Sequence, residues 1–503
     1  MLIESITQGF ALFATPLVVI LIILGIVFGL LVGAVPGLGP LMGIVLILPV
    51  AINLQPITAM ALLLGIYVGG SCGGSISAIL LRIPGTPLAA ATLFDGYPLA
   101  QKGRAAEAVG VAISSSALGG LIGGVILITS APILAIFARQ FSPPEFTMLA
   151  ITGLVAIASV SEGSFLKGIL SGCLGLILAT IGTDQISMGY RFTFDSHHML
   201  NGFHLVSIVV GMFAISEMVF QMMGKNLTAK PNIPIVRAEF KSVLSVLKNW
   251  KNLIRSSLIG TFFGILPGAG GVISSFAAYA VAKNSAKPHE KYGEGEVGGV
   301  IATESANNAT CGGALVPSLA LGIPGDPIAA LLVATLLIFG FYPGPTLFED
   351  QPEIVGAIFI VYLASNVALL ILGVLLTPLF VYALRIRKSR LIPAILVLCV
   401  VGTFALQSSI FDLWAMLGFG LVGIILRIVN YPLAPIVIGT ILGPLLENNL
   451  RRSLLLSDEG YWIFLDRPVS AVLLVVNALL LSWVAWSTIR KIRSPDSKQE
   501  DPA

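Results

Sequence analysis

Long apolar runs follow one another along almost the whole of this 503-residue chain. A helix needs about 20 mostly apolar residues to cross a bilayer, and many of these runs have about that length. Only 11% of the residues are charged and 56% are hydrophobic, whereas a soluble domain is about a quarter charged. So few charges cannot cover a soluble surface, and the hydrophobicity excludes disorder. The sequence therefore predicts an all-α polytopic membrane protein.

The apolar runs differ in length. Several are too short for a full span and some are too long, and the run 39–52 has the length of a re-entrant hairpin. We therefore expect roughly 12 transmembrane spans and some re-entrant pieces. The candidate segments are 11–33, 57–81, 107–138, 146–160, 164–182, 203–222, 256–282, 298–322, 328–342, 354–384, 391–407, 411–427, 432–446 and 468–488.

The longest polar stretch, 225–255, divides the chain and is strongly basic, with one acid, Glu239. The positive-inside rule places it in the cytoplasm, together with the basic C-terminal tail. Apolar residues recur in it at helical spacing from Val236 to Ile254, which predicts an amphipathic helix on the bilayer surface; a solvated linker is the alternative. The predicted parts are a first membrane repeat (1–223), this linker (224–255), a second membrane repeat (256–450) and a C-terminal span with its tail (451–503).

The two membrane parts resemble each other. GLLVGAVPGLG at 29–39 matches GTFFGILPGAG at 260–270, CGG at 72–74 matches CGG at 311–313, and IPGTP at 83–87 matches IPGDP at 323–327. The order is the same, and the offset drifts only from 231 to 240 residues. Three ordered matches of this length indicate an internal repeat.

Charges beside the matched segments indicate that the repeats are inverted. Lys102 and Arg104 follow the first IPGTP segment, whereas Glu349 and Asp350 follow the IPGDP segment. Opposite charge bias in equivalent loops predicts opposite orientation in the membrane. Inverted repeats with broken helices are typical of secondary transporters, which bind substrate where the repeats meet.

Proline and glycine interrupt both repeats at equivalent places. Proline removes a backbone donor and glycine allows positive φ, so these positions predict broken helices or re-entrant hairpins that expose carbonyl groups suited to Na⁺. A simple kink is the alternative for a single break, but a matched pair favours a site. The predicted ion-binding residues of these breaks are Pro36, Gly37, Gly39, Pro267, Gly268 and Gly270.

A second matched pair of segments, 69–75 and 307–313, contains small and polar residues within apolar runs. Adjacent Asn307 and Asn308 are costly in hydrocarbon unless they are satisfied, and their amides offer donors and acceptors to a carboxylate. Glu304 lies one turn earlier, and an acid within the membrane is a functional candidate. We expect free backbone N–H groups around Gly73–Ser75 and Gly312–Gly313, at two opposed hairpin tips, to hold the anion. Close helix packing is the alternative for the glycines. The predicted substrate-binding residues are Gly73, Gly74, Ser75, Asn307, Asn308, Thr310, Gly312 and Gly313.

Thr86 and Asp326 occupy equivalent positions in the two Pro-Gly-x-Pro turns. Either is a candidate Na⁺ ligand, and Asp326 could instead cap a helix. The difference between them argues against symmetric ion sites.

Other function classes fit less well. The sequence has no GxxxxGK[ST] loop and no HExxH motif, so ATP hydrolysis within the chain and zinc hydrolase chemistry are not expected. A membrane-embedded enzyme would need clustered acids or histidines within the membrane, and the sequence has only scattered ones. An anion channel would need a continuous pore, against which the paired broken helices argue. A purely structural scaffold would not need paired polar breaks in its helices. The net charge of +3 argues against nucleic-acid binding. We expect a transporter that is not an enzyme and has no organic cofactor.

The matched segments also resemble a known family. The runs 29–40, 73–105, 264–271 and 309–332 are similar to the large membrane subunit of the tripartite tricarboxylate transporters, the TctA family, and the similarity spans about residues 15 to 450. The block from Gly73 to Ala105 is the most specific part.

This resemblance implies uptake of a di- or tricarboxylate such as citrate across the bacterial inner membrane, driven by an ion gradient, typically Na⁺, and an elevator-type motion. It implies two partners, a small four-helix TctB-like membrane subunit and a periplasmic TctC-like solute-binding protein. Neither the particular carboxylate nor the oligomeric state follows from the sequence, and a homo-oligomer stays open.

Overall fold

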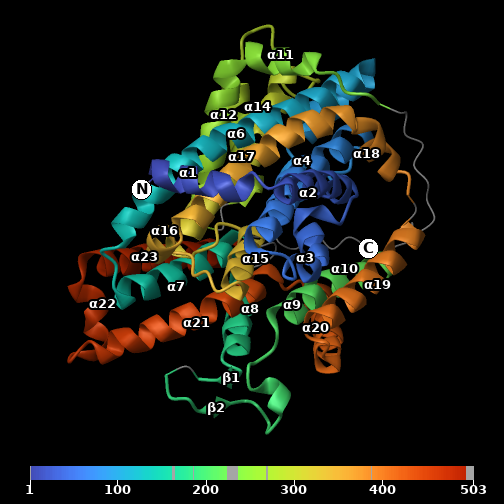
Figure 1. Ribbon diagram of the computed structural model, residues 1–503. Coiled ribbons are helices and arrows are strands. Elements are labelled where there is room, and N and C mark those ends of the chain that lie inside the picture. Colours follow the sequence, from blue (N-terminus) through green and yellow to red (C-terminus); the bar gives the residue numbers. More distant parts are fainter. Residues whose placement is uncertain are drawn as a thin grey trace. The chain divides into compact units, whose positions relative to one another are not determined.

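The computed structural model describes residues 2–160, 165–184, 186–223, 236–267, 270–386 and 388–493. This part of the chain is almost entirely helical, with one two-stranded sheet, as the apolar runs predict. It forms two compact units (Figure 1). Unit 1 consists of Met1–Arg139 and Leu205–Ile424, and unit 2 consists of Gln140–His204 and Ile425–Ala503.

Unit 1 holds most of the long helices, and the chain enters and leaves it twice. Its first segment contains α1 (Leu2–Phe13), α2 (Pro16–Ala34), α3 (Gly39–Ala51), α4 (Pro56–Leu81), η1 (Pro87–Ala89), α5 (Leu93–Leu99), η2 (Ala100–Arg104) and α6 (Ala105–Ala138). Its second segment contains α9 (Leu205–Val209), η4 (Val210–Ile215), α10 (Ser216–Met223), α11 (Lys241–Lys248), α12 (Trp250–Ile265), α13 (Gly270–Asn284), α14 (Val297–Leu321), α15 (Pro327–Ile338), α16 (Pro345–Asp350), α17 (Pro352–Leu375), α18 (Thr377–Ala383), α19 (Lys388–Gln407) and most of α20 (Ile410–Ile428).

Glycine stripes bring the helices of unit 1 into backbone contact. A Cβ atom on Gly33 of α2 would lie 2.2 Å from the carbonyl oxygen of Gly70 on α4, and one on Gly264 of α12 would lie 2.4 Å from that of Thr310 on α14. The repeat matches Gly33 with Gly264, and Gly70 with Ala309, the residue before Thr310. The pairs α2–α4 and α12–α14 therefore make their close contacts at positions that correspond to within one residue.

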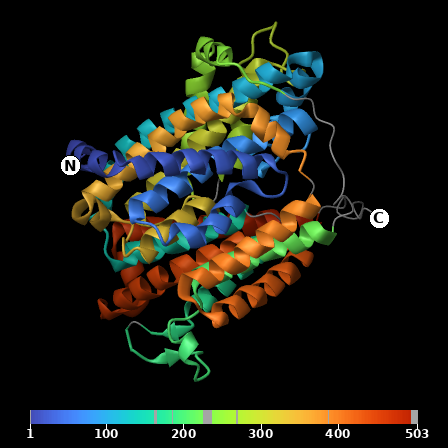
Figure 2. The ribbon, with the colours of Figure 1, turned by 45° about the vertical axis from the view of Figure 1, so that its right-hand side comes forward.

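Helices from the two repeats also pack on each other. Gly119 of α6 lies against Ser305 of α14, and α17 packs on α4. The N-terminal helix α1 crosses α17 where Gly9 meets the backbone of Gly356 (Figure 2). Small residues permit such close approach, since association within a bilayer depends on packing rather than on the hydrophobic effect.

Unit 2 is built around four longer helices and a hairpin. Glycines again set the packing, because Gly175 of α8 meets Ile436 of α21 and Gly439 of α21 meets Gly172 of α8. The elements are α7 (Pro143–Val160), α8 (Phe165–Ala179), β1 (Gly182–Thr183), β2 (Tyr190–Arg191), η3 (His197–Met199), α21 (Ala434–Leu455), η5 (Gly460–Trp462), α22 (Ile463–Asp466) and α23 (Pro468–Arg493).

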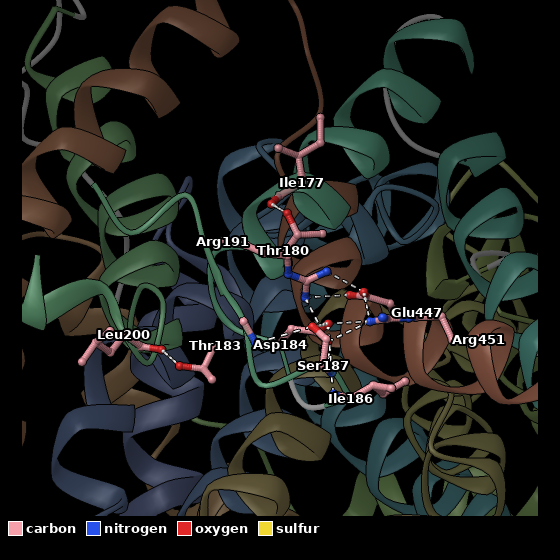
Figure 3. A network of polar contacts seen from close by, with 11 residues as sticks. Ile177, Thr180, Thr183, Asp184, Ile186, Ser187, Arg191, Leu200, Glu447 and Arg451 are labelled. Atoms are coloured by element: carbon pink, nitrogen blue, oxygen red, sulfur yellow. Dashed lines mark hydrogen bonds and ion pairs between the residues drawn. The ribbon is translucent and has the colours of Figure 1, made fainter. Parts of the chain in front are cut away.

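The antiparallel hairpin of unit 2 pairs Gly182 with Arg191 and Thr183 with Tyr190. Ion pairs connect the hairpin to α21 (Figure 3). Arg451 reaches both carboxylate oxygens of Asp184 at 2.8 Å, and Arg191 contacts Glu447 at 2.6 and 3.1 Å. Two arginines and two acids of opposite charge thus link the loop and the helix.

Six helical stretches in the described residues are long and apolar enough to cross a membrane, and a bent pair, Gly460–Asp466 with Pro468–Ser482, makes a seventh if it forms one span. The six are Pro16–Ala34, Pro56–Leu81, Leu93–Ala138, Leu205–Met223, Pro352–Leu375 and Ile410–Ile428. Shorter apolar helices include Gly39–Ala51, the predicted hairpin-length run, and Pro327–Ile338.

The expected amphipathic helix at 236–254 is divided in the structure, because α11 ends at Lys248 and α12 begins at Trp250. Val246 and Leu253 are buried, and α11 packs on α6. Five large apolar side chains of this stretch are exposed by 41–59%: Phe240, Leu244, Leu247, Trp250 and Ile254. The stretch therefore has two apolar faces, one buried in the protein and one open.

Candidate functional site

The Pro-Gly segments interrupt the helices as the sequence predicts. Helix α2 ends at Ala34 and α3 begins at Gly39, with positive φ at Gly37 (90°) and Gly39 (67°). In the second repeat α12 ends at Ile265 and α13 begins at Gly270, where φ is 57°. Side chains other than glycine rarely adopt this left-handed region. Pro267 is half-buried, and the predicted ion-binding residue Gly268 lies outside the described residues.

The second pair of segments has a different geometry from the one expected. Gly73, Gly74 and Ser75 lie within the continuous helix α4, and Asn307 to Gly313 lie within the continuous helix α14. Amide groups inside a helix donate to carbonyls four residues earlier. The expectation of free N–H groups at hairpin tips is therefore wrong for these glycines, because the chain turns later, at 82–87 and 322–327.

The four predicted substrate-binding glycines serve helix packing. A Cβ atom on each would lie less than 3 Å from another part of unit 1. The nearest atoms are the Leu30 carbonyl oxygen for Gly73 (2.7 Å), Thr86 Oγ1 for Gly74 (2.5 Å), the Gly123 carbonyl carbon for Gly312 (2.7 Å) and the Thr261 carbonyl oxygen for Gly313 (2.4 Å).

The two asparagines join helices of both repeats. Asn307 Nδ2 donates to the carbonyl oxygen of Ser71 on α4 at 3.0 Å. Asn308 Nδ2 lies 3.4 Å from Asn366 Oδ1 on α17. Both asparagines and Asn366 are fully buried. The Oδ1 atom of Asn307 has no hydrogen-bond partner, which leaves a strong acceptor open within the protein.

Hydroxyl groups complete this centre. Thr310 Oγ1 lies 2.7 Å from the Ala306 carbonyl oxygen, 3.1 Å from that of Gly260 and 2.8 Å from Ser274 Oγ. The Tyr362 hydroxyl donates to the carbonyl oxygen of Asn308 at 3.2 Å. The predicted residues Asn307, Asn308 and Thr310 therefore sit in one buried polar centre on α14.

The two Pro-Gly-x-Pro turns use their third residue differently. Asp326 caps α15, since its Oδ1 accepts from the backbone N–H of Ala329 at 2.7 Å, while its Oδ2 accepts from the Tyr67 hydroxyl. Of the two roles considered for Asp326, the structure shows the cap. Thr86 is only 2% exposed, and its hydroxyl has no partner, so it stays available as a ligand.

Asp95, in the DGYP part of the first repeat, organises the loop before α14. Its Oδ1 accepts from the backbone N–H groups of Gly293, Gly295 and Glu296 at 2.8 Å each, and its Oδ2 accepts from the Tyr279 hydroxyl at 2.9 Å. A carboxylate next to a helix N-terminus also interacts favourably with the helix dipole. Asp95 therefore ties the first repeat to the start of α14.

Sequence reasoning missed Tyr67, Asp95, Tyr362 and Asn366. Asn366 carried a usable signal, since it is a polar residue within the apolar run 354–384. Tyr67 carried none, because its hydroxyl partner is 259 residues away. In the described residues no group of three or more His, Cys, Asp or Glu side chains is placed to hold a metal ion.

Helices long and apolar enough to cross a membrane surround a buried polar centre to which both repeats contribute, which defines a polytopic membrane protein. Residues 19–438 match the model of the tripartite tricarboxylate transporter TctA family, and the chain belongs to this family.

Relatives are found in Agrobacterium vitis. An uncharacterized 52.8 kDa protein encoded in the 3′ region of ttuC′ in TAR-I is 34% identical over 505 residues, which is 99% of both chains. An uncharacterized protein from the corresponding region of TAR-II is 35% identical over 242 residues, 48% of this chain and all of that protein. No solved structure matches the chain.

Proposed function

We propose that this protein is the transport subunit of a binding-protein-dependent tripartite system, which takes up a di- or tricarboxylate across the bacterial inner membrane together with Na⁺. The family match supports the transporter class. The basic linker and the C-terminal tail lie in the cytoplasm in this proposal, by the positive-inside rule.

The observation that carries the proposal is the buried asparagine pair at the junction of the repeats. Asn307 binds α4 through its amide nitrogen, and Asn308 faces Asn366 of α17. Three fully buried amides from two helices are costly in a membrane protein unless they serve a ligand or one another. Their donors suit carboxylate oxygens.

The coupling ion offsets the charge of the substrate. We place Na⁺ at the carbonyl groups of the two Pro-Gly breaks and at the buried Thr86 hydroxyl. Asp326 contributes to this arrangement as the cap of α15. Carbonyls freed at helix breaks are the usual ligands for coupling ions in transporters with broken helices.

The repeats have opposite orientation in this proposal, with roughly 12 spans in all. The hairpin parts move past a fixed scaffold in an elevator-type motion. The exposed apolar face formed by Phe240, Leu244, Leu247, Trp250 and Ile254 belongs to the scaffold and lies on the cytoplasmic surface of the bilayer. A TctB-like subunit and a TctC-like binding protein complete the system, and a homo-oligomer stays compatible with it.

Uptake of [¹⁴C]citrate and [¹⁴C]succinate in cells that produce this chain with its two partners tests the proposal. We expect saturable uptake that falls when choline replaces Na⁺. N308A should lower uptake at least tenfold at low substrate concentration while the protein stays in the membrane. The matched control is N449A, because Asn449 only donates to a carbonyl of its own helix.

Uptake that rises linearly with concentration and ignores Na⁺ would favour an anion channel instead. Normal uptake by N308A at substrate concentrations below KM would remove the asparagine site from the proposal.

A further inference from the structure

Glu304 of α14 is a fully buried acid, and in the described residues no basic side chain forms an ion pair with it. Of the other buried acids, Asp184 pairs with Arg451 and Glu145 with Arg467, while Asp95 accepts hydrogen bonds from three backbone N–H groups and the Tyr279 hydroxyl. Glu304 has a hydroxyl partner instead, since Thr92 Oγ1 lies 2.5 Å from its Oε1, and its Oε2 has no partner. An ionised carboxylate is very costly in such a place unless a proton or a cation accompanies it.

Neutral oxygen atoms surround this carboxylate. Ser75 of α4 and Asn307 of α14 lie beside it, and Thr303 Oγ1 lies 3.0 Å from the Thr92 hydroxyl. The Oδ1 atom of Asn307 is buried and without a partner, as is the Glu304 Oε2 atom. The open carboxylate oxygen of Glu304, with the hydroxyl oxygens beside it, provides the oxygen ligands that a hard cation requires.

We propose that Glu304, Ser75, Thr92 and Asn307 form a binding site for a monovalent cation, Na⁺, distinct from the Pro-Gly breaks. One carboxylate among neutral oxygens balances one positive charge, and the described residues hold no cluster of acids that would favour a divalent ion. The site deepens the proposed function, since Asn307 would touch both the cation and the substrate site.

The repeat does not duplicate the site. The offset of 239 residues between the CGG segments places Gly65 opposite Glu304, the offset of 240 between the IPG segments places Leu332 opposite Thr92, and both residues are buried. The other repeat therefore offers no carboxylate and no hydroxyl at the matched positions. A cation held here connects α4, α14 and the start of α5, which come from both repeats.

Thermal unfolding of the purified full-length chain in detergent tests the site without any carboxylate present. The midpoint is measured as NaCl replaces choline chloride at constant ionic strength. We expect the wild-type midpoint to rise with Na⁺, because a ligand that binds only the folded state stabilises it. E304Q should lose the part of the shift that this site supplies and keep at most the response of the Pro-Gly site, and T92V and S75A should each weaken the response at least threefold.

The matched control is E296Q, which removes the same charge from the N-cap of the same helix and should respond to Na⁺ as the wild type does. In choline, E304Q should unfold at or above the wild-type temperature, since it removes an unbalanced buried charge. If E304Q does not fold, binding of ²²Na⁺ to T92V and S75A gives the same comparison.

A shift that E304Q retains at the full wild-type size would overturn the site. So would a wild-type midpoint that ignores Na⁺ and responds only to pH, which would make Glu304 a proton carrier. Loss of carboxylate uptake with an intact, Glu304-dependent Na⁺ response would refute the proposed substrate and leave the cation site standing.

Discussion

The hydroxyl of Tyr67, in the middle of α4, donates a hydrogen bond to Oδ2 of Asp326, the residue that caps α15. The bond joins a helix of the first repeat to the turn of the second. Tyr67 is 1% exposed, so water cannot replace its partner.

We expect Y67F to destabilise unit 1 by about 1–3 kcal/mol, since Asp326 keeps its bond to Ala329 but loses its second buried donor. Thermal unfolding in detergent measures the loss. Y342F is the control, because Tyr342 is 69% exposed. An unchanged midpoint for Y67F would show that this bond contributes nothing to the fold.

Removing the Asp95 side chain should free the loop before α14. D95A leaves three backbone N–H groups without their acceptor, each costing about 1–3 kcal/mol if it stays buried, whereas D95N keeps one acceptor oxygen. We expect trypsin to cut after Lys291 much faster in D95A and only moderately faster in D95N. D458A, a change at an exposed acid, should match the wild type, and equal cleavage in all four proteins would contradict the anchoring role.

A methyl group at the close crossings of α2 with α4 and of α12 with α14 should not be tolerated. A Cβ atom on Gly33 or Gly264 would lie 2.2 or 2.4 Å from a backbone oxygen, so the helices must separate. Overpacking of this kind costs about 1–3 kcal/mol. We expect G33A and G264A each to lower the yield of folded, monodisperse protein on size-exclusion chromatography. G418A serves as the control, because no atom lies within 4 Å of its Cβ position, and it should be neutral or stabilising.

The ion-pair network of unit 2 should make its stability depend on pH. Hydrogen bonds from Arg451, and then from Ser187, hold the pKa of Asp184 well below its usual range. A depressed folded-state pKa adds stability above the unfolded value of about 3.9, and this stability is lost as the pH falls through the folded value. D184N should therefore unfold at a lower temperature than the wild type at pH 7, and the difference should shrink below about pH 4.

The control for this comparison is D195N, which changes an exposed acid of the same loop region. A D184N deficit that stays constant from pH 7 to the acid range would show that the charge of Asp184 is not what stabilises the hairpin.

Labelling from the two sides of the membrane tests the inversion of the repeats. Lys102 and Asp350 are both exposed, and Cys173 is an exposed native thiol that must first be changed to serine. We expect an impermeant maleimide to reach K102C and D350C from opposite sides. Reaction of both from one side would exclude inverted repeats.

The positions of the helices were largely predictable, since the predicted runs 57–81 and 298–322 correspond to α4 (Pro56–Leu81) and α14 (Val297–Leu321). The breaks at Gly37 and Gly270 were predictable as well, because their positive φ restricts the choice of residue. The role of Gly73 and Gly312 was not, since a small residue suits both an open backbone and a close helix crossing.

The sequence by itself determined a membrane-embedded helical protein with an internal repeat. The thickness of the bilayer sets the length of each apolar segment, and the backbone polar groups of a segment must form their hydrogen bonds within it, so both requirements can be read from the local sequence. Only the tertiary structure decided which polar groups meet. Tyr67 and Asp326, or Thr92 and Glu304, are far apart in the chain and come together only through packing. A buried carboxylate without a basic partner is a property of the folded neighbourhood, and no local pattern encodes it.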